Sequence, residues 1–384
     1  MSDNLPFAGL RVLELAAVLA GPQVGQFFAE LGADVLKVEP PAGDVTRTWR
    51  TAGDNPDSSV SAYFAASNWG KEALTLDLAQ PAAQAELHRL ALAADVLLVS
   101  YKPGDTEKFG VGYAALAAAN PRLIYAHLTG YGPASPRVGY DAVLQAETGF
   151  MHLNAASPAD PPQKMPVALI DLLAAHQLKE GILTALYQRE KTGRGALIEV
   201  SLLDSSLASL ANQGATWLTT GRDPVPLGSG HPGIVPYGTV YRAVDGQRLV
   251  LAVGTDAQFR QLCLVLMRPR WAQEPRFATN PARVRHRVAL EELLLMRIAE
   301  LNGTALLHEL ARLGVPAGAV RSVGEALGQE AAQAMLLPPA PPQFPYPGLR
   351  TVAFRSSAWS VVMALNAPPE QQAPRASQQV PAQK

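Results

Sequence analysis

Residues Leu10–Glu39 read LRVLELAAVLAGPQVGQFFAELGADVLKVE, and this stretch decides the fold. Leu10–Leu15 is a short apolar run that predicts a β-strand, and Asp34–Glu39 predicts a second strand. Between them Pro22–Leu31 carries a helical pattern, and it opens on a proline, which suits the first turn of a helix. A strand, a helix and a strand in this order form a βαβ unit, which implies a parallel sheet.

The same alternation continues through the first third of the chain. It predicts further strands at Ala73–Leu78, Asp95–Ser100 and Arg122–His127, with a helix at Pro81–Ala93. We therefore expect an α/β fold with a large, Rossmann-like parallel-sheet domain. Open parallel sheets bind ligands beyond the carboxyl ends of their strands. This rule places a site near four loops, namely Ala17–Pro22, Pro40–Arg47, Ser100–Lys108 and Thr129–Tyr140.

Asp171 stands out because the apolar run Val167–Ile170 delivers its carboxylate to the start of a long helix that ends near Lys191. As an N-cap, Asp171 would accept hydrogen bonds from the first free amides of that helix, whose dipole favours the charged form. A charged carboxylate is also what nucleophilic catalysis requires. Asp171 can thus be a cap, a nucleophile or both. A later helix, Asp204–Leu218, is expected to begin with Asp204 as its own cap.

The chain is expected to divide into two domains and a tail. Residues 1–220 form the large domain, which is completed by about 331–366. The Gly- and Pro-rich stretch Gly221–Tyr237 predicts a linker to a smaller α/β domain at 225–330, where Asp245-Gly246 predicts a β-hairpin. Residues 367–384 are rich in Gln, Pro and Ala, with too few large apolar side chains to offset the entropy of ordering, so we expect disorder there.

Composition excludes several classes of function. The 384 residues carry 32 Lys+Arg and 33 Asp+Glu, so no overall field favours nucleic acid or an anionic membrane as a partner. Cys263 is the only cysteine, which rules out an intramolecular disulfide, and no Cys/His cluster has the spacing of a zinc site. The N-terminus has no signal-peptide pattern and no apolar run is long enough to span a bilayer. We expect a soluble, cytoplasmic protein without a metal.

Familiar nucleotide and hydrolase motifs are missing. After the first predicted strand, Ala16–Pro22 reads AAVLAGP, without the glycines of a nicotinamide Rossmann site, and the chain has neither a Walker loop nor a Gly-x-Ser-x-Gly elbow. Basic residues instead recur near the predicted strand ends, which suggests an anionic ligand with several phosphates. These residues are Lys37, Arg47, Lys71, Lys102 and Lys108.

An ordered series of motifs resembles the class III CoA-transferases, the family of formyl-CoA transferase and the carnitine CoA-transferases. The resemblance covers about Leu10–Met335, and the order of the motifs makes it specific although each one is short. The motifs are Arg11–Leu15 (RVLEL), Ala20–Pro22 (AGP), Leu31–Glu39 (LGADVLKVE), Asn68–Lys71 (NWGK), Lys102–Gly104 (KPG), Gly139–Asp141 (GYD), Asp171 and Tyr187–Gly195 (YQREKTGRG).

The resemblance implies that Asp171 is the catalytic nucleophile. Its carboxylate would attack an acyl-CoA thioester, free CoA would convert the resulting anhydride to an aspartyl-CoA thioester, and an acceptor acid would complete the exchange. Water must be kept out, because it would hydrolyse the anhydride. The implied substrates are an acyl-CoA and a small carboxylic acid, with no permanently bound cofactor, and the implied assembly is an interlocked homodimer.

The CoA contacts of the family map onto four short segments of this chain. In formyl-CoA transferase the position of Leu19 is a glutamine and that of Pro40 is an arginine, and a mobile tetraglycine loop stands where this chain has Gly230–Tyr237, so formyl or oxalyl specificity is not expected. The tail lacks the closing motif of the family and has Val352–Leu365 in its place. The implied CoA-binding residues are Leu19, Ala20, Asn68, Lys71, Ser100, Tyr101, Lys108 and Phe109.

Two other functions remain open on the sequence. The α-methylacyl-CoA racemases of the same superfamily abstract and return an α proton, and they carry Gly-His-Asp where this chain has Gly139-Tyr140-Asp141. Tyrosine, with an ordinary pKa of about 10, is a poor base near neutral pH, which favours CoA transfer. Tyr140 and Asp141 would then orient the acceptor acid, and Asp141 would tune Asp171 or cap a loop. The second alternative is a catalytically inactive CoA-binding protein.

Overall fold

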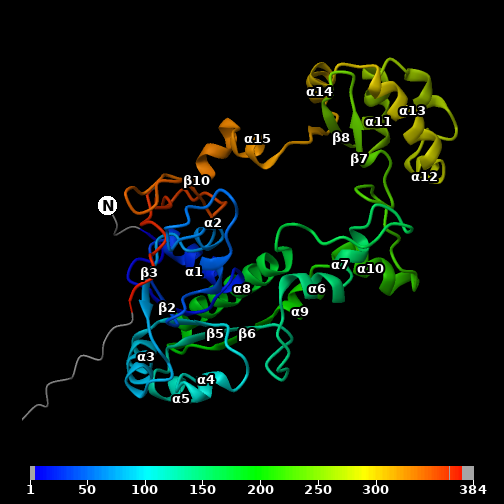
Figure 1. Cartoon of the computed structure of the whole chain (residues 1–384). Helices are drawn as coiled ribbons and strands as arrows, with labels where there is room; N and C mark the ends of the chain where they lie inside the picture. The colour runs from blue at the N-terminus through cyan, green and yellow to red at the C-terminus, as the bar shows by residue number, and fades with distance from the viewer. Residues whose placement is uncertain (1–4, 363, 374–384) are drawn as a thin grey trace, which may run out of the picture. The chain divides into compact units, whose positions relative to one another are not determined.

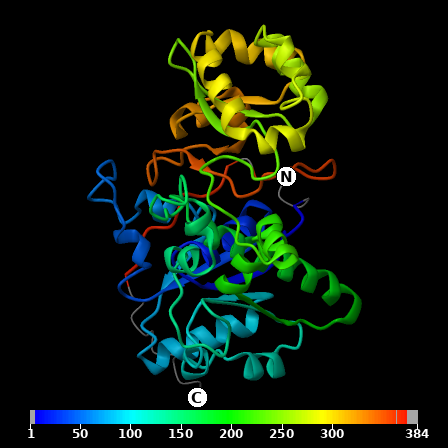
Figure 2. The same cartoon turned by 90° about the vertical axis from the view of Figure 1, so that its right-hand side faces the viewer.

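The computed structural model describes residues 5–362 and 364–373, and the chain forms two compact units (Figure 1; Figure 2). The large unit comprises residues 1–148, 166–211 and 333–384, and the small unit comprises residues 149–165 and 212–332. Residues 149–165 therefore group with the small unit although they are distant from most of it in the sequence. Each unit has an apolar core of its own and is described separately.

A six-stranded sheet forms the centre of the large unit, in the order β3-β2-β1-β4-β5-β6, and every neighbouring pair of strands is parallel. The expected α/β fold with a large parallel sheet is confirmed. The chain proceeds from β1 toward one edge and from β4 toward the other, so the carboxyl ends of β1 and β4 form the switch point where open sheets bind ligands. The strands are β1 (Arg11–Leu15), β2 (Asp34–Glu39), β3 (Glu72–Thr75), β4 (Val96–Val99), β5 (Ile124–Thr129) and β6 (Leu197–Ser201).

Helices cover both faces of this sheet (Figure 1). α1 (Ala20–Glu30) and α8 (Leu169–Thr192) pack against each other on one face, while α3 (Pro81–Ala93) and α5 (Tyr113–Ala119) cover the other. α8 ends where Gly193 adopts a φ of 72°, a left-handed conformation that glycine adopts without a steric penalty. Shorter elements of this unit are η1 (Val45–Thr48), α2 (Ala62–Ala65), α4 (Asp105–Lys108), α6 (Asp141–Glu147) and α9 (Leu202–Ala208).

The C-terminal segment completes the large unit, where β10 (Leu336–Leu337) pairs with β11 (Gly348–Leu349). Thr351 donates to the buried Glu30 carboxylate from its backbone nitrogen and from its hydroxyl, at 2.7 and 2.9 Å. Further along, the carbonyl oxygens of Pro369 and Gln372 accept hydrogen bonds from the Arg47 and Thr75 side chains. The disorder expected for residues 367–384 therefore does not describe Pro369 and Gln372, while residues 374–384 lie outside the described residues.

The small unit contains an antiparallel three-stranded sheet in the order β7-β8-β9. Its hairpin turns at Asp245-Gly246, as the sequence predicted, and Gly246 has a φ of 82°. Helices α11–α14 gather against this sheet (Figure 1; Figure 2). The core of this unit consists mainly of leucine, valine and phenylalanine side chains. The elements are α7 (Phe150–Leu153), α10 (Ala211–Thr220), β7 (Tyr237–Arg242), β8 (Arg248–Ala252), α11 (Asp256–Val265), η2 (Pro269–Gln273), α12 (Asn280–Arg285), α13 (Arg287–Ala299), α14 (Gly303–Arg312), β9 (Ala317–Ala319) and α15 (Val323–Leu327), followed by η3 (Glu330–Met335).

The single helix expected at Asp204–Leu218 is wrong. α9 ends at Ala208, and Ala211, the first residue of α10, has a φ of 46°, which a continuous right-handed helix does not allow. The cap of α9 is also not Asp204, because the chain turns directly from β6 into the helix. Ser201 is the N-cap, and its hydroxyl accepts a hydrogen bond from the backbone nitrogen of Asp204 at 2.9 Å.

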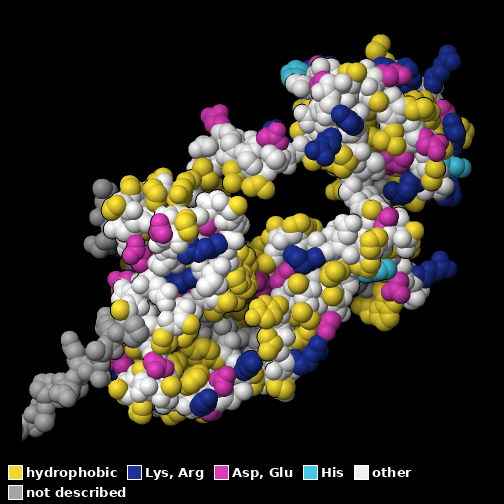
Figure 3. Space-filling view, in the orientation of Figure 1, with side chains coloured by type: hydrophobic (Ala, Val, Ile, Leu, Met, Phe, Trp, Pro, Cys, Tyr) yellow, Lys and Arg dark blue, Asp and Glu magenta, His cyan; other side chains and the backbone are white. Residues whose placement is uncertain are grey.

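Charged side chains of both signs are interspersed on the visible surfaces of both units (Figure 3). This mixture agrees with the near balance of 32 basic and 33 acidic residues. Among the helices of the described residues, none combines the length and the apolar character that crossing a membrane requires.

Candidate active site

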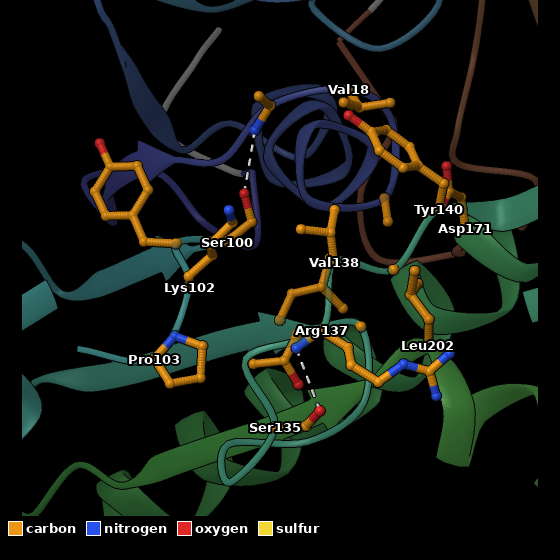
Figure 4. Close-up of a pocket in the computed structure, with 17 residues that line it drawn as sticks. Val18, Ser100, Lys102, Pro103, Ser135, Arg137, Val138, Tyr140, Asp171 and Leu202 are labelled. Carbon is orange, nitrogen blue, oxygen red and sulfur yellow. Dashed lines mark hydrogen bonds between the residues drawn. The ribbon is translucent and has the colours of Figure 1, made fainter. Parts of the chain in front are cut away.

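A cavity of about 230 Å³ opens at the carboxyl ends of the central strands (Figure 4). Its walls come from the turn after β1 and the first residue of α1, the loop after β4, the end of β5 with the loop that follows it, the first turn of α8 and the first residue of α9. It therefore lies at the switch point of the sheet, where ligands of open α/β folds bind. The lining includes Ala17, Val18, Ala20, Ser100, Tyr101, Lys102, Arg137, Tyr140 and Asp171.

Asp171 is the acidic residue of this lining, with 7% of its surface exposed. Burial, and then the nearby charge of Asp141, raise the pKa of Asp171 from 3.8 to about 7. Within the described residues no salt bridge is formed to it. The interpretation of Asp171 as an N-cap is wrong, because α8 begins at Leu169 and its N-cap is Ala168. The carboxylate is thus free of a capping role.

Asp141 performs the capping that was expected of Asp171. It is the first residue of α6 and is buried, and its Oδ1 accepts a hydrogen bond from the backbone nitrogen of Ile170 at 2.8 Å. Its Oδ2 accepts another from Gln145 Nε2, also at 2.8 Å. Asp141 therefore fixes the first turn of α8 while it places a second negative charge beside Asp171, although it does not line the cavity itself.

The loop between β5 and α6 supplies one wall of the cavity. Gly130 and Gly139 meet backbone to backbone, since a Cβ built on Gly139 would lie 2.5 Å from the Gly130 Cα. This contact closes the loop at its base and requires glycine at both positions. Arg137 and Tyr140 line the cavity from this loop, and Tyr140 is half exposed.

The turn after β1 contains a strained residue at the cavity wall. Val18 has a φ of 71°, a left-handed conformation that β-branched residues rarely adopt. The backbone nitrogen of Ala17 donates to the Ser100 hydroxyl oxygen at 3.3 Å, and that of Val18 donates to Asp44 Oδ1 at 3.4 Å. The first bond holds the turn against the loop that follows β4, and the second holds it against the loop that follows β2.

Three of the basic residues that the sequence assigned to a phosphate ligand are buried and paired. Lys37 lies 3.0 Å from both Glu14 and Asp44, and Lys71 lies 2.8 Å from the other oxygen of Glu14. Arg47 contacts Glu39 at 2.7 Å. These cations stabilise neighbouring carboxylates inside the large unit and are not exposed to a phosphate. Lys102 and Lys108 are exposed, and Lys102 lines the cavity.

The structure brings together some of the predicted CoA-binding residues. Ala20, Ser100 and Tyr101 line the cavity, and burial raises the pKa of Tyr101 to about 12. Leu19 is the buried residue before α1, while Lys108 and Phe109 stand beyond the cavity, with Phe109 packed edge-on against Tyr101 at 5.5 Å between ring centroids. Asn68 and Lys71 are buried and hydrogen-bonded to each other at 2.9 Å. The geometry therefore gives no support for side-chain contacts from this pair to CoA.

Sequence reasoning missed Tyr63. Burial raises the pKa of Tyr63 above its ordinary value of 10, and the negative charges of Asp171 and Asp141 add to this effect, although Tyr63 does not line the cavity. The ring of Trp49 packs edge-on against Tyr63 at 5.0 Å between centroids. No motif marks this segment, so only the folded chain reveals its proximity to Asp171.

Comparison with known proteins identifies the family. The sequence profile of CoA-transferase family III matches residues 7–372. The chain belongs to this family. It is 39% identical over 336 residues to a succinate–glutarate CoA-transferase of Agrobacterium fabrum, covering 86% of this chain and 83% of that protein. It is 37% identical over 340 residues to an acetyl-CoA:oxalate CoA-transferase of Acetobacter aceti, covering 86% of this chain and 85% of that protein.

Solved structures of the family share the fold. A CAIB/BAIF family protein from Brucella suis superposes with a TM-score of 0.84 at 38% identity, over 95% of this chain and 96% of that one. The family and its named members support CoA transfer in general, with CoA thioesters as substrates. Within the described residues there is no group of three or more His, Cys, Asp or Glu side chains arranged to hold a metal ion.

Two properties of Asp171 bear on the chemistry that the cavity of this CoA-transferase family member can support. Its carboxylate is buried at the wall of the cavity, and no salt bridge within the described residues neutralises it. Burial also limits the contact of this carboxylate with bulk water. The raised pKa of Asp171 also means that its charged form is only partly populated near neutral pH before substrate binds.

Proposed function

We propose that this chain transfers CoA reversibly between an acyl-CoA and a free carboxylic acid, with Asp171 as the nucleophile. The observation that carries the proposal is the position of Asp171, which is buried in the wall of a cavity at the switch point of the sheet. Its pKa, raised to about 7, is the kind of perturbation that is common at functional sites. Membership of the family supports the reaction class.

The proposed exchange proceeds through covalent intermediates. The Asp171 carboxylate attacks the thioester carbonyl, and the carbon–sulfur bond breaks to release CoA thiolate and leave a mixed anhydride. The thiolate attacks the aspartyl carbonyl of the anhydride, which expels the donor acid as a carboxylate and forms aspartyl-CoA thioester. The acceptor carboxylate then attacks this thioester and repeats the two steps in reverse order, so that a new acyl-CoA leaves and Asp171 regains its charge. No net proton is consumed.

The cavity accommodates only the reacting end of the substrates. Ligand sites for drug-sized molecules occupy roughly 300–1,000 Å³, whereas this cavity measures about 230 Å³. We therefore place the thioester and acceptor acid inside it, next to Ala20, Ser100 and Tyr101, with the nucleotide end of CoA outside. The exposed Lys102 and Lys108 are the cations best placed to meet its phosphates.

Asp141 is proposed as a positioning residue for Asp171. Its hydrogen bond from the backbone nitrogen of Ile170 sets the start of α8, and its charge contributes to the raised pKa of Asp171. Tyr140, on the cavity wall, is proposed to orient the acceptor acid. We assign CoA binding to the large unit, and by resemblance we propose a cytoplasmic homodimer.

A racemase is the second candidate, because a carboxyl group with a pKa near 7 is also suited to moving a proton. The two activities give different products. Exchange of the α proton for deuterium in labelled water, without CoA transfer to any acid, would establish the racemase.

The proposal is tested by intact-protein mass spectrometry after incubation with short acyl-CoAs. Wild type should gain a CoA or acyl adduct that hydroxylamine removes, and Asp171→Asn should not. Asp204→Asn is a matched control, because Asp204 occupies the third position of α9 as Asp171 does in α8. An adduct on Asp171→Asn, or none on wild type that still binds CoA, would overturn the assignment.

A further inference from the structure

The turn between β1 and α1 is bonded at three consecutive residues to side chains from elsewhere in the large unit. The Ala16 carbonyl oxygen accepts a hydrogen bond from Lys37 Nζ at 2.6 Å. The Ala17 nitrogen donates to Ser100, and the Val18 nitrogen donates to Asp44 Oδ1 at 3.4 Å. The cation Lys37 and the anion Asp44 therefore take backbone groups of opposite polarity at the two ends of this turn.

Lys37 and Asp44 are also bonded to each other. Lys37 Nζ lies 3.0 Å from Asp44 Oδ2, and both side chains are 1% exposed. Burial acts to raise the pKa of Asp44, but Lys37 and the hydrogen bonds from Thr46 outweigh it and hold this pKa below 3.8. The buried pair is therefore charged. Hydrogen bonds to charged groups are roughly twice as strong as those between neutral groups, so the pair holds the turn more firmly than neutral side chains would.

The conformation of Val18 needs such a hold. Its φ of 71° lies in the left-handed region, where glycine is the usual residue and a β-branched side chain is strained. Strain of this kind persists only where the surroundings enforce it, and it gathers at functional sites. The bonds to Ala16 and Val18 enforce it here from both sides.

The same turn forms part of the cavity wall. Ala17, Val18 and Ala20 line the cavity together with Asp171. In Figure 4, Val18 lies on the same side of the view as Tyr140 and Asp171. α1 begins at Ala20, so the backbone angles of Val18 also set the direction in which the chain enters this helix. A change in φ at Val18 would move the wall that the substrate meets.

We infer that Lys37 and Asp44 are a positioning pair for CoA transfer, which holds Val18 in its left-handed conformation and so fixes the wall against which the thioester is placed. This inference rests on the proposed function and adds two residues that do not line the cavity. Strained backbone conformations of this kind are disfavoured by roughly 5–150-fold. Loss of the pair should reduce the fraction of molecules with a competent turn by a factor in this range.

A role in stability alone is the competing explanation, since removing one partner of any buried ion pair is destabilising. The two explanations differ at Val18. If the pair acts by enforcing the conformation of Val18, a residue that adopts this conformation without strain should make the pair dispensable for the reaction. If the pair only stabilises the large unit, the residue at position 18 should make no difference.

The test measures the maximum rate of adduct formation on Asp171, with acetyl-CoA or succinyl-CoA, whichever labels wild type faster, by mass spectrometry of quenched samples. Asp44→Asn keeps the shape of the side chain and its oxygen for capping η1, but it cannot form the ion pair. It should lower the maximum rate at least about fivefold.

The same substitution is then made in two matched backgrounds. In the Val18→Gly background Asp44→Asn should lower the rate no more than about twofold, because glycine adopts a positive φ at no steric cost. In the Val18→Ala background the loss should remain at least about fivefold, because alanine shortens the side chain but keeps the Cβ. Lys37→Arg, which keeps the charge in a different donor geometry, should give the same pattern and replaces Asp44→Asn if that variant does not fold.

Glu30→Gln is the control for a buried carboxylate in the same unit. Glu30 is fully buried at the other end of α1, where it binds Thr351 and has no contact with the turn. Glu30→Gln should leave the maximum rate of adduct formation within about twofold of wild type.

Three results would overturn the inference. These are an unchanged maximum rate in Asp44→Asn, an equal loss in the Val18→Gly and Val18→Ala backgrounds, or a change confined to the acyl-CoA concentration that gives half the maximum rate. If wild type forms no adduct, the proposed function fails by itself. Urea unfolding of the same variants then decides, since Val18→Gly should be more stable than Val18→Ala by a wider margin with Asp44 present than in Asp44→Asn, and equal margins would overturn the inference.

Discussion

Asp171→Asn should stabilise the protein at about pH 8 and leave its stability nearly unchanged at about pH 4. The pKa of Asp171 in the fold is about 7, against an ordinary 3.8. Because the folded state holds the proton more tightly than the unfolded state, wild type loses stability as the pH rises from about 4 to about 7. At roughly 1.4 kcal/mol per pKa unit, the shift corresponds to a loss of about 4 kcal/mol. Asparagine does not ionise and escapes this loss.

The assay is urea unfolding of both proteins, followed by circular dichroism at several pH values. The difference in unfolding free energy between them isolates Asp171, because all other titrating groups are shared. It should grow across the window from about pH 4 to about pH 7 and then level off. Asp141→Asn provides a check, since removing that charge should shrink the rise and move it to lower pH. A difference that stays constant with pH would refute the reasoning about burial.

Other perturbations test the site and its support. Adduct formation on Asp171 should accelerate as the pH rises through about 7, because only the ionised carboxylate attacks, and Asp141→Asn should move this pH profile to lower pH. The rate is measured by mass spectrometry of samples quenched at successive times. A rate that does not change with pH would contradict the prediction. Lys37→Met should cost about 3–5 kcal/mol in urea unfolding, because it leaves the buried Asp44 without a cation and Glu14 with Lys71 alone. A loss below about 1 kcal/mol would show that water reaches these carboxylates. Gly139→Ala should abolish most adduct formation, because its Cβ would lie 2.5 Å from the Gly130 Cα, whereas unchanged adduct rates would mean that the loop has no part in the site.

The sequence predicted the central sheet because its signals are local. Each strand is a short apolar run, and the helix Pro81–Ala93 was placed correctly because a proline marks its first turn. The prediction that Asp171 caps its helix was wrong because the signal that sets the start of this helix is not local. The start of α8 depends on the bond from Ile170 to Asp141, which lies 29 residues earlier and leaves no trace in the local pattern.

The basic residues near the strands were also misinterpreted because their partners are distant in the sequence. Lys37 and Lys71 do lie in or beside strands, as expected, yet the sequence could not reveal that both share Glu14, which is 23 and 57 residues away. The positive charges of Lys37 and Lys71, which suggested a phosphate ligand, are paired with buried carboxylates inside the large unit. Tyr63 was missed because nothing near it in the sequence resembles a site, and its relation to Asp171 exists only in the folded chain.

The bond between Glu30 and Thr351 has a consequence for biosynthesis. The large unit cannot be completed until residue 351 has left the ribosome, 321 residues after Glu30. At roughly 5–20 residues per second, this delay is about 15–60 s. Once Ser201 has been synthesised, the nascent chain contains every strand of the parallel sheet, while the Glu30 carboxyl has Gln26 as a donor but still lacks the donors of Thr351 and Val352. A shortened chain that ends before Thr351 would remain in this unfinished state, and the cell would have to protect it or degrade it.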